Sequence, residues 1–260
     1  MRCLWTAATG MEAQQTNMDT IANNLANANT TGFKESRANF ADLMYQTLIP
    51  AGASNSNNNQ VPTGIQIGMG VKTSSVEKMF AQGNFTQTGN NLDMAIQGNG
   101  FFQVLRGTQQ AYTRDGSFKV NQNGDIVDAG GYMLQPQITL PKTAVTVSID
   151  PSGVLTATNS TGNVVLTTNM QLYLFPNPAG MQDIGNNYYI PTPASGNVTT
   201  DTPGGPNGGG TILQGYLEAS NTNVVNDMVN MILSQRSYEA NSKVIKSADQ
   251  MMQMANNVVS

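Results

Sequence analysis

The sequence lacks histidine altogether and contains a single cysteine, Cys3. Histidine is the commonest general base and a common metal ligand, so sites built on it are excluded. One cysteine cannot form an internal disulfide or a thiolate metal cluster. Without histidine, the abundant serines and threonines could be activated only by lysine or a carboxylate, and no catalytic constellation is evident. We therefore expect neither a catalytic activity nor a cofactor nor a bound metal.

Charge is also scarce, because only 11% of the 260 residues are charged, against roughly 25% in average proteins. The hydrophobic fraction is only 39%, so uncharged polar residues and glycine take the place of the missing charges. Such a surface is poorly protected against self-association, which suits a subunit that is surrounded by neighbours. The net charge of −4 argues against nucleic-acid binding, which needs a concentrated basic face.

The sequence has no run of about 18 apolar residues, so it predicts no membrane-spanning helix. The first 15 residues contain one arginine but no continuous apolar stretch, which makes them a poor secretory signal. If the protein leaves the cytoplasm, we expect it to do so without a cleaved signal peptide.

Near the N-terminus, apolar residues recur with heptad spacing, which is typical of a coiled-coil helix. The residues of this stripe are Leu4, Met11, Met18, Ile21 and Leu25. The predicted helix ends near Asn29, because Gly32 suits a left-handed C-terminal cap.

The C-terminus repeats the heptad pattern over a longer span, and Met228 widens the stripe at its start. The residues spaced by seven are Val224, Met231, Tyr238, Ile245, Met252 and Val259. The predicted helix runs from about 223 to 258 and would be about 54 Å long. Two interpretations are open, namely two core-facing helices of a globular domain or a coiled coil formed by both ends. The narrow stripe, flanked by polar residues, favours the coiled coil.

Residues 31–75 are predicted to form an extended connector, in which the stretch from Phe40 to Tyr45 could make a short amphipathic helical turn. Residues 50–64 contain almost no hydrophobic side chains and cannot fold alone. This polar tract is either a mobile loop or a loop that orders against a neighbouring subunit.

From about 76 to 219 the apolar period changes to two, and turn signals are frequent, which predicts a domain of short antiparallel strands. Asn123-Gly124 predicts a hairpin with a type I′ turn. The Gly/Pro-rich residues 203–210 then return the chain to the C-terminal helix. The expected fold class is α+β, with a terminal helical domain (1–30 and 220–260), the connector and a β-rich outer domain (76–219).

Three glycine-rich or oxygen-rich segments do not match the ligand-binding motifs that they most resemble. Residues 64–74 lack the Gly-Lys pair of a phosphate loop, and residues 97–103 lack the third glycine of a dinucleotide fingerprint. Residues 121–128 carry clustered oxygens, but the glycine of a calcium loop is out of register.

Two long motifs carry a resemblance to a known family. ANNLANANTTGFK at 22–34 and LQGYLEASNTNVVNDMVNMILSQRSYEANSKVIKSADQMM at 213–252 resemble the rod and hook family of bacterial flagellar axial proteins. The segments at 4–24, 62–90, 97–104 and 111–118 are similar to the members that build the distal part of the rod. The residues of the first motif are Asn23, Asn24, Leu25, Asn27, Gly32 and Phe33.

The resemblance implies a structural subunit whose terminal helices pair as a coiled coil and line an inner tube. It implies a periplasmic distal rod that is a rigid, hollow drive shaft and is exported by the flagellar export apparatus. The implied partners are further copies, proximal rod proteins, the hook protein, the rod-cap protein and the peptidoglycan-ring and outer-membrane-ring proteins. The loop at 46–66 resembles a rod-specific insertion, with Pro50, Asn57, Asn58, Asn59 and Pro62 as its marker residues.

Alternatives of the same class are a proximal rod subunit or a hook subunit, although a hook protein should carry an additional outer domain. An alternative of another class is a secreted β-rich adhesin or hydrolase. The helices at both termini and the missing histidine argue against the adhesin and the hydrolase.

Overall fold

The computed structural model describes residues 2–51 and 63–259, and side chains as far as residue 257. The chain divides into two compact units. Unit 1 contains residues 1–26, 36–77 and 223–260, and unit 2 contains residues 27–35 and 78–222. Each unit is therefore assembled from segments that are far apart in the sequence.

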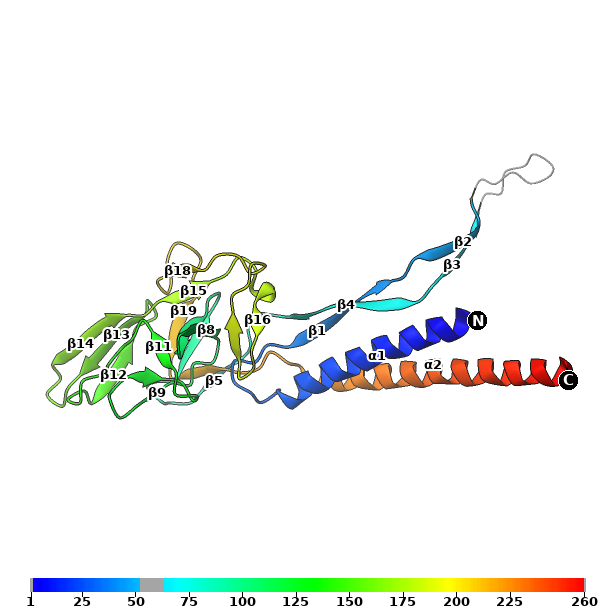
Figure 1. Ribbon diagram of the computed structural model, residues 1–260. Helices are drawn as coiled ribbons and strands as arrows, with labels where there is room; N and C mark the ends of the chain where they lie inside the picture. Colours follow the sequence, from blue (N-terminus) through cyan, green and yellow to red (C-terminus); the bar gives the residue numbers. More distant parts are fainter. Residues whose placement is uncertain (1, 52–62, 260) are drawn as a thin grey trace. The chain divides into compact units, whose positions relative to one another are not determined.

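Unit 1 contains two helices, α1 (Arg2–Ala26) and α2 (Val224–Val259). They lie side by side and run antiparallel (Figure 1). The side chain of Asn17 donates to Ser234 at 2.8 Å, and Gly10 lies against Asn241, which fixes the register of the pair. The expected pairing of the two terminal helices is confirmed. The helix ends fall close to the predicted ones, at Ala26 rather than about Asn29 and at Val259 rather than about 258.

The connector also belongs mainly to unit 1 and forms a long two-stranded ribbon (Figure 1). Its pairs are β1 with β4 and β2 with β3. The strands are β1 (Ser36–Asp42), β2 (Tyr45–Ile49), β3 (Ile65–Gly68) and β4 (Val71–Lys78). The predicted helical turn at Phe40–Tyr45 is wrong, because these residues belong to β1, β2 and the short link between them. A short apolar run fits both the helical and the strand period. Here the hydrogen bonds to β3 and β4 favour the strand.

Unit 2 is the predicted domain of short antiparallel strands. Its largest sheet has seven strands in the order β16-β17-β8-β7-β11-β10-β9. The strands are β7 (Phe102–Arg106), β8 (Gln109–Thr113), β9 (Lys119–Val120), β10 (Ile126–Val127), β11 (Met133–Gln135), β16 (Gln182–Asp183) and β17 (Tyr188–Ile190). A short 3-10 turn at Pro178–Gly180 precedes β16.

Smaller sheets complete unit 2. A three-stranded sheet has the order β12-β13-β14, and three further pairs are β15 with β18, β19 with β6, and β20 with β5. The strands are β5 (Phe85–Gln87), β6 (Met94–Gln97), β12 (Thr146–Ile149), β13 (Val154–Thr158), β14 (Val164–Asn169), β15 (Leu172–Leu174), β18 (Thr199–Asp201), β19 (Thr211–Gln214) and β20 (Tyr216–Glu218). The α+β fold class is thereby confirmed.

The core of unit 2 combines alternate residues of the strands, such as Phe102 and Val104 of β7, with residues from the links between strands. Phe102, Phe118, Leu134 and Leu155 are among the fully buried members. A second cluster consists of aromatic rings in edge-to-face contact, such as Tyr112 against Phe175 with centroids 4.9 Å apart. Such pairs add about 0.5–1.5 kcal/mol beyond the burial of their area.

The predicted hairpin at Asn123-Gly124 exists, but its turn differs from the predicted type I′ turn. Five residues, 121–125, separate β9 from β10, and Val120 pairs with Ile126. Only Gly124 has a positive φ there, at +93°. The side-chain oxygen of Asn121 accepts hydrogen bonds from the backbone N–H groups of Asn123 and Asp125, which closes the wider loop.

Candidate functional site: a helix pair and a buried charge cluster

The contact line between α1 and α2 consists mostly of small and polar residues. On α2 the buried positions are Asp227, Ser234 and Ala248, which belong to one heptad position together with the half-buried Asn241. Buried residues of α1 are Ala7, Ala13, Thr20, Ile21 and Asn24. Small side chains let the two backbones approach closely, so the larger apolar residues of each heptad lie beside the contact line rather than in it.

The predicted interface residues therefore differ in their burial within one chain. Ile21 is buried. The half-buried residues are Leu4, Met11, Met18, Leu25, Met231, Ile245 and Met252. Val224, Met228 and Tyr238 are exposed. The side chain of Val259 lies outside the described residues.

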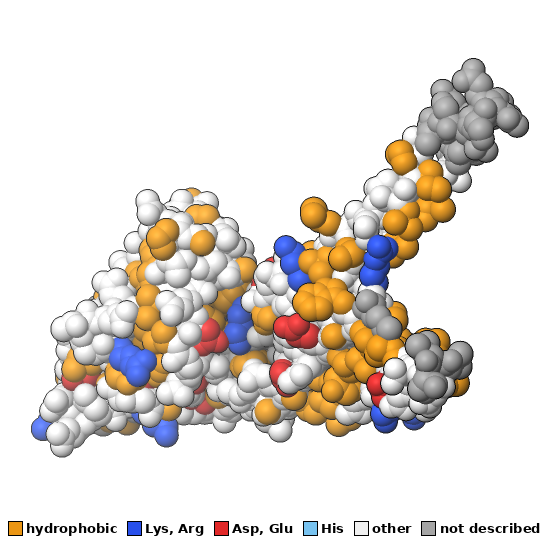
Figure 2. All heavy atoms as spheres, turned by 45° about the vertical axis from the view of Figure 1, so that its right-hand side comes forward, with side chains coloured by type: hydrophobic (Ala, Val, Ile, Leu, Met, Phe, Trp, Pro, Cys, Tyr) orange, Lys and Arg blue, Asp and Glu red, His pale blue; other side chains and the backbone are white. Residues whose placement is uncertain are grey.

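Large apolar side chains are exposed on unit 1, and Figure 2 shows patches of them on one face. On α2 they include Val225, Val229, Ile232, Leu233, Val244, Met251 and Met254. On the ribbon they include Met44, Tyr45, Leu48, Ile49, Ile65 and Ile67. Contiguous apolar surface of this extent marks an interaction site, and a two-stranded ribbon is only marginally stable in water. Unit 1 thus presents apolar surfaces that need a covering partner.

The motif residues connect α1 with the segments that follow it. The Asn24 side chain donates to the backbone oxygen of Ser36 and accepts from its N–H, both at 2.8 Å, which pins the start of β1 to α1. Asn23 is exposed, and Leu25 and Asn27 are half-buried. Gly32 and Phe33 are buried, and Phe33 lies under the ammonium group of Lys78, which is 4.4 Å from the ring centroid.

The loop predicted at 46–66 is described only at its ends, where residues 46–49 and 65–66 belong to the paired strands β2 and β3 rather than to a loop. Pro50 is exposed, whereas Asn57, Asn58, Asn59 and Pro62 lie outside the described residues.

Unit 2 contains a buried ionic cluster that the sequence patterns did not predict. The carboxylate of Glu218 lies 2.6 Å from the Lys34 ammonium group and 3.4 Å from the Arg114 guanidinium. The side chains of Lys34 and Glu218 have no exposed surface. These three residues are far apart in the sequence, so no local spacing could reveal the cluster.

Backbone groups complete the cluster. Lys34 donates to the oxygen of Ala81 at 2.7 Å, Arg114 donates to the oxygen of Gly98 at 2.7 Å, and Glu218 accepts from the N–H of Gly83 at 2.9 Å. Burial lowers the pKa of Lys34 and of Arg114, and the attraction of Glu218 partly opposes this effect. The cluster joins the segment after α1, the segment before α2 and the end of β8 within unit 2.

Gly32 shows how tightly the chain segments around the charge cluster of unit 2 are packed. Its φ is +67°, its N–H donates to the backbone oxygen of Glu218 at 2.8 Å, and a Cβ added here would lie 2.7 Å from the backbone nitrogen of Asp115.

We expect Gly32→Ala to destabilise unit 2 by about 2–5 kcal/mol, from about 1–2 kcal/mol for the left-handed backbone and about 1–3 kcal/mol for the clash. The matched control is Gly107→Ala, because Gly107 has φ +66° and nothing within 4 Å of the added Cβ. Denaturant unfolding of both variants measures the difference, and equal losses would show that the close approach at Gly32 has no energetic weight.

Asp227, in the first turn of α2, is a buried carboxyl group in the helix contact line. One of its oxygens has no hydrogen-bond partner among the described residues. Burial raises its pKa above the ordinary value of 3.8.

Because the folded state holds the proton of Asp227 more tightly, its contribution to stability is present at low pH and is lost as pH rises through the raised pKa. We expect Asp227→Asn to remove this part of the pH dependence. Helix unfolding followed by circular dichroism between about pH 3 and 7 tests this. Parallel curves for the parent and the variant would contradict it.

The described part of the chain holds no group of three or more acidic or cysteine residues that could bind a metal ion. None of its helices is long and apolar enough to cross a membrane. The features that stand out are thus apolar faces and a structural charge cluster.

Comparison with protein families gives matches along most of the chain. Residues 4–34 match the family described as flagella basal body rod protein. Residues 95–157 match the D1 domain of flagellar hook protein FlgE/F/G, and residues 213–258 match the C-terminal region of flagellar basal body rod FlgEFG proteins.

Individual relatives extend the similarity to the full length. The flagellar basal-body rod protein FlgG of Caulobacter vibrioides is 48% identical over 257 residues, with 97% of each chain covered. FlgG of Buchnera aphidicola from Schizaphis graminum is 46% identical over 252 residues, with 96% of each chain covered. The flagellar hook protein FlgE of Helicobacter mustelae is 42% identical over 137 residues, which is 52% of this chain and 30% of the hook protein.

Proposed function

Because the chain belongs to the FlgG family of flagellar basal-body rod proteins and is thus a structural component of the rod, we propose that it builds the distal rod by helical self-assembly. The assembled rod would be a rigid, hollow drive shaft that transmits motor torque to the hook and serves as the export channel. In this proposal the protein has no catalytic role.

The observation that carries this proposal is the apolar surface that a single copy leaves uncovered on α2. Ile232 and Leu233, for example, are 55% and 59% exposed, although they lie inside a regular helix. Burying such a side chain fully contributes about 1.5–3 kcal/mol, so contacts repeated in every subunit would stabilise a polymer strongly. The contact has to be heterologous, because an isologous one would stop at a dimer.

We propose a periplasmic location, reached through the flagellar export apparatus without a cleaved signal peptide. The proposed partners are further copies, proximal rod proteins, the hook protein, the rod-cap protein and the proteins of the peptidoglycan and outer-membrane rings. The proposal rests on the relatives' shared name, flagellar basal-body rod protein, and on the exposed apolar side chains of unit 1.

A hook subunit is the weaker alternative within the family. The hook protein of Helicobacter mustelae is matched over only 30% of its length, whereas the FlgG relatives named above are matched over 96–97% of theirs. A proximal rod subunit would share the terminal helices, so the complementation experiment below has to distinguish it from a distal rod subunit.

Electron microscopy of the purified, concentrated protein tests the proposal. We expect straight tubes or short rods that appear above a threshold concentration. A protein that stays monomeric at every concentration, or that closes into dimers, would contradict self-assembly. In a strain that lacks its own distal rod protein, restored motility would support the distal position, and restoration only of a strain lacking a proximal rod protein would refute it.

A further inference from the structure

The three-stranded sheet of unit 2 has two outer sides of different character. β13 lies in the middle and pairs with β12 through Val147 opposite Ala157 and with β14 through Ala157 opposite Leu166. β12 and β14 are therefore the outer strands, and because they are antiparallel to the same strand they run in the same direction.

The outer strand β14 carries no charge, and it begins with two exposed valines. Its sequence is VVLTTN, and Val164 and Val165 are 61% and 38% exposed. Soluble proteins usually protect an edge strand with a charge, a proline or a covering segment. A β-bulge at Ala157/Thr158 bends the ladder next to Val164, but neither charge nor proline occurs within β14.

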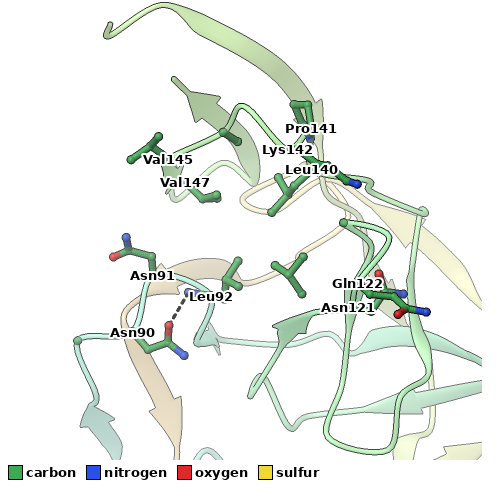
Figure 3. A pocket seen from close by; sticks show the side chains of 14 residues that line it. Asn90, Asn91, Leu92, Asn121, Gln122, Leu140, Pro141, Lys142, Val145 and Val147 are labelled. Atoms are coloured by element: carbon green, nitrogen blue, oxygen red, sulfur yellow. Dashed lines mark hydrogen bonds between the residues drawn. The ribbon is translucent and has the colours of Figure 1, made fainter. Parts of the chain in front are cut away.

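The opposite side of the sheet borders a pocket of about 540 Å³ (Figure 3). Its apolar wall includes Leu92, Val120, Leu140, Val145 and Val147, and asparagine and glutamine side chains form its rim. Lys142 is the one charged residue that lines it. The pocket thus has room and chemistry for one or two aliphatic side chains of an uncharged segment.

The backbone edge of β12 beside the pocket is already occupied. The Gln214 amide donates to the oxygen of Val147 at 2.9 Å and accepts from the N–H of Ile149 at 3.0 Å. A further strand cannot take over these two groups. A docking segment therefore has to insert side chains into the pocket rather than extend the hydrogen-bonded ladder.

We propose that the pocket of one copy receives Val164 and Val165 from the β14 edge of a second copy. Charge favours this occupant, because an uncharged valine edge meets an apolar wall with one lysine at its rim, and no unpaired charge is buried. The strand registers place Val164, Thr158 and Thr146 opposite one another across the three strands. A second copy shifted across the strands, with β14 toward β12 of the first copy, therefore brings its valines next to Val145.

Each added copy leaves one β14 edge and one pocket free for the next copy. The contact is therefore heterologous, and it can continue without closing. It involves the β domain rather than the terminal helices. The inference therefore goes beyond the proposed role of the helices, and the two can fail separately.

Cysteine cross-linking in assembled rods tests the contact. In a Cys3→Ser background, Val145→Cys combined with Val164→Cys is expected to give a ladder of covalent oligomers on oxidation. A bond within one chain is excluded, because two strand spacings of about 4.8 Å separate these positions, whereas a disulfide needs Cα atoms about 4.4–6.8 Å apart. Val145→Cys combined with Thr108→Cys, at an exposed turn, is the matched control and should give no ladder.

Charge exchange supplies a second measurement that does not depend on disulfide geometry. Val145→Lys and Val164→Glu should each raise the protein concentration needed for assembly, and the double variant should recover most of that loss. Rods that form without a ladder and without this recovery would overturn the inference while leaving assembly through the helices intact. Failure of the parent itself to assemble would contradict the proposed function instead. If Val145→Lys left assembly unchanged but abolished binding of a different protein, the pocket would belong to that partner and the inference would be wrong.

Discussion

Ile245→Asp is expected to abolish rod assembly while the β domain stays folded. Ile245 is half-buried beside the contact line of α1 and α2, one heptad from Tyr238 and Met252. In an assembled rod its remaining surface would be covered by neighbouring subunits. Losing the buried isoleucine then costs about 2–5 kcal/mol in every subunit, and desolvation of an unpaired carboxylate adds to this.

The control is Ser247→Asp, because Ser247 is exposed and lies off the stripe. Sedimentation and electron microscopy measure assembly, thermal unfolding reports on the β domain, and secretion assays report on export. Normal rods from Ile245→Asp, or a melted β domain, would show that α2 is not the assembly element.

Glu218→Gln should produce the largest loss of stability in unit 2. The substitution keeps the size of the side chain but leaves the buried charges of Lys34 and Arg114 without a counter-charge. Removing one partner of a buried ion pair typically costs about 3–5 kcal/mol. Denaturant unfolding of the isolated protein measures this loss.

Two comparisons separate the effect of burial from that of charge. Glu77→Gln removes the partner of Arg37 in an exposed ion pair and should cost no more than about 1 kcal/mol. The triple variant Lys34→Met, Arg114→Met and Glu218→Leu removes all three charges and should recover much of the loss. If Glu218→Gln lowered the free energy of unfolding no more than Glu77→Gln does, the charge cluster would not stabilise unit 2.

Sequence patterns predicted the elements that depend on local periodicity. Heptads located both helices to within about three residues, and a period of two located the β domain. The ribbon could not be predicted, because the apolar residues from Phe40 to Ile49 fit either period and their pairing partner lies beyond a polar tract. The heptads also could not show which position faces α1, since that depends on the size of the side chains on the opposite helix.

The charge cluster marks a different limit. Lys34, Arg114 and Glu218 each sit in an unremarkable local context, and only the tertiary fold brings them together. The turn between β9 and β10 also differs from the predicted type I′ turn. The Asn121 side chain closes it, rather than the Asn-Gly pair alone.

The unequal lengths of the two helices have a kinetic consequence for growth. The contacts of Asn17 with Ser234 and of Gly10 with Asn241 place Arg2 level with Asp249, so the last turns of α2 run past the start of α1 (Figure 1). This end of α2 lacks the cover of α1, and the last turns of a helix fray readily when no neighbour packs against them. A preformed polymer end offers this segment a template, whereas two free copies must order it together. Elongation should therefore be fast and nucleation slow, so that assembly begins with a lag that short preformed seeds remove.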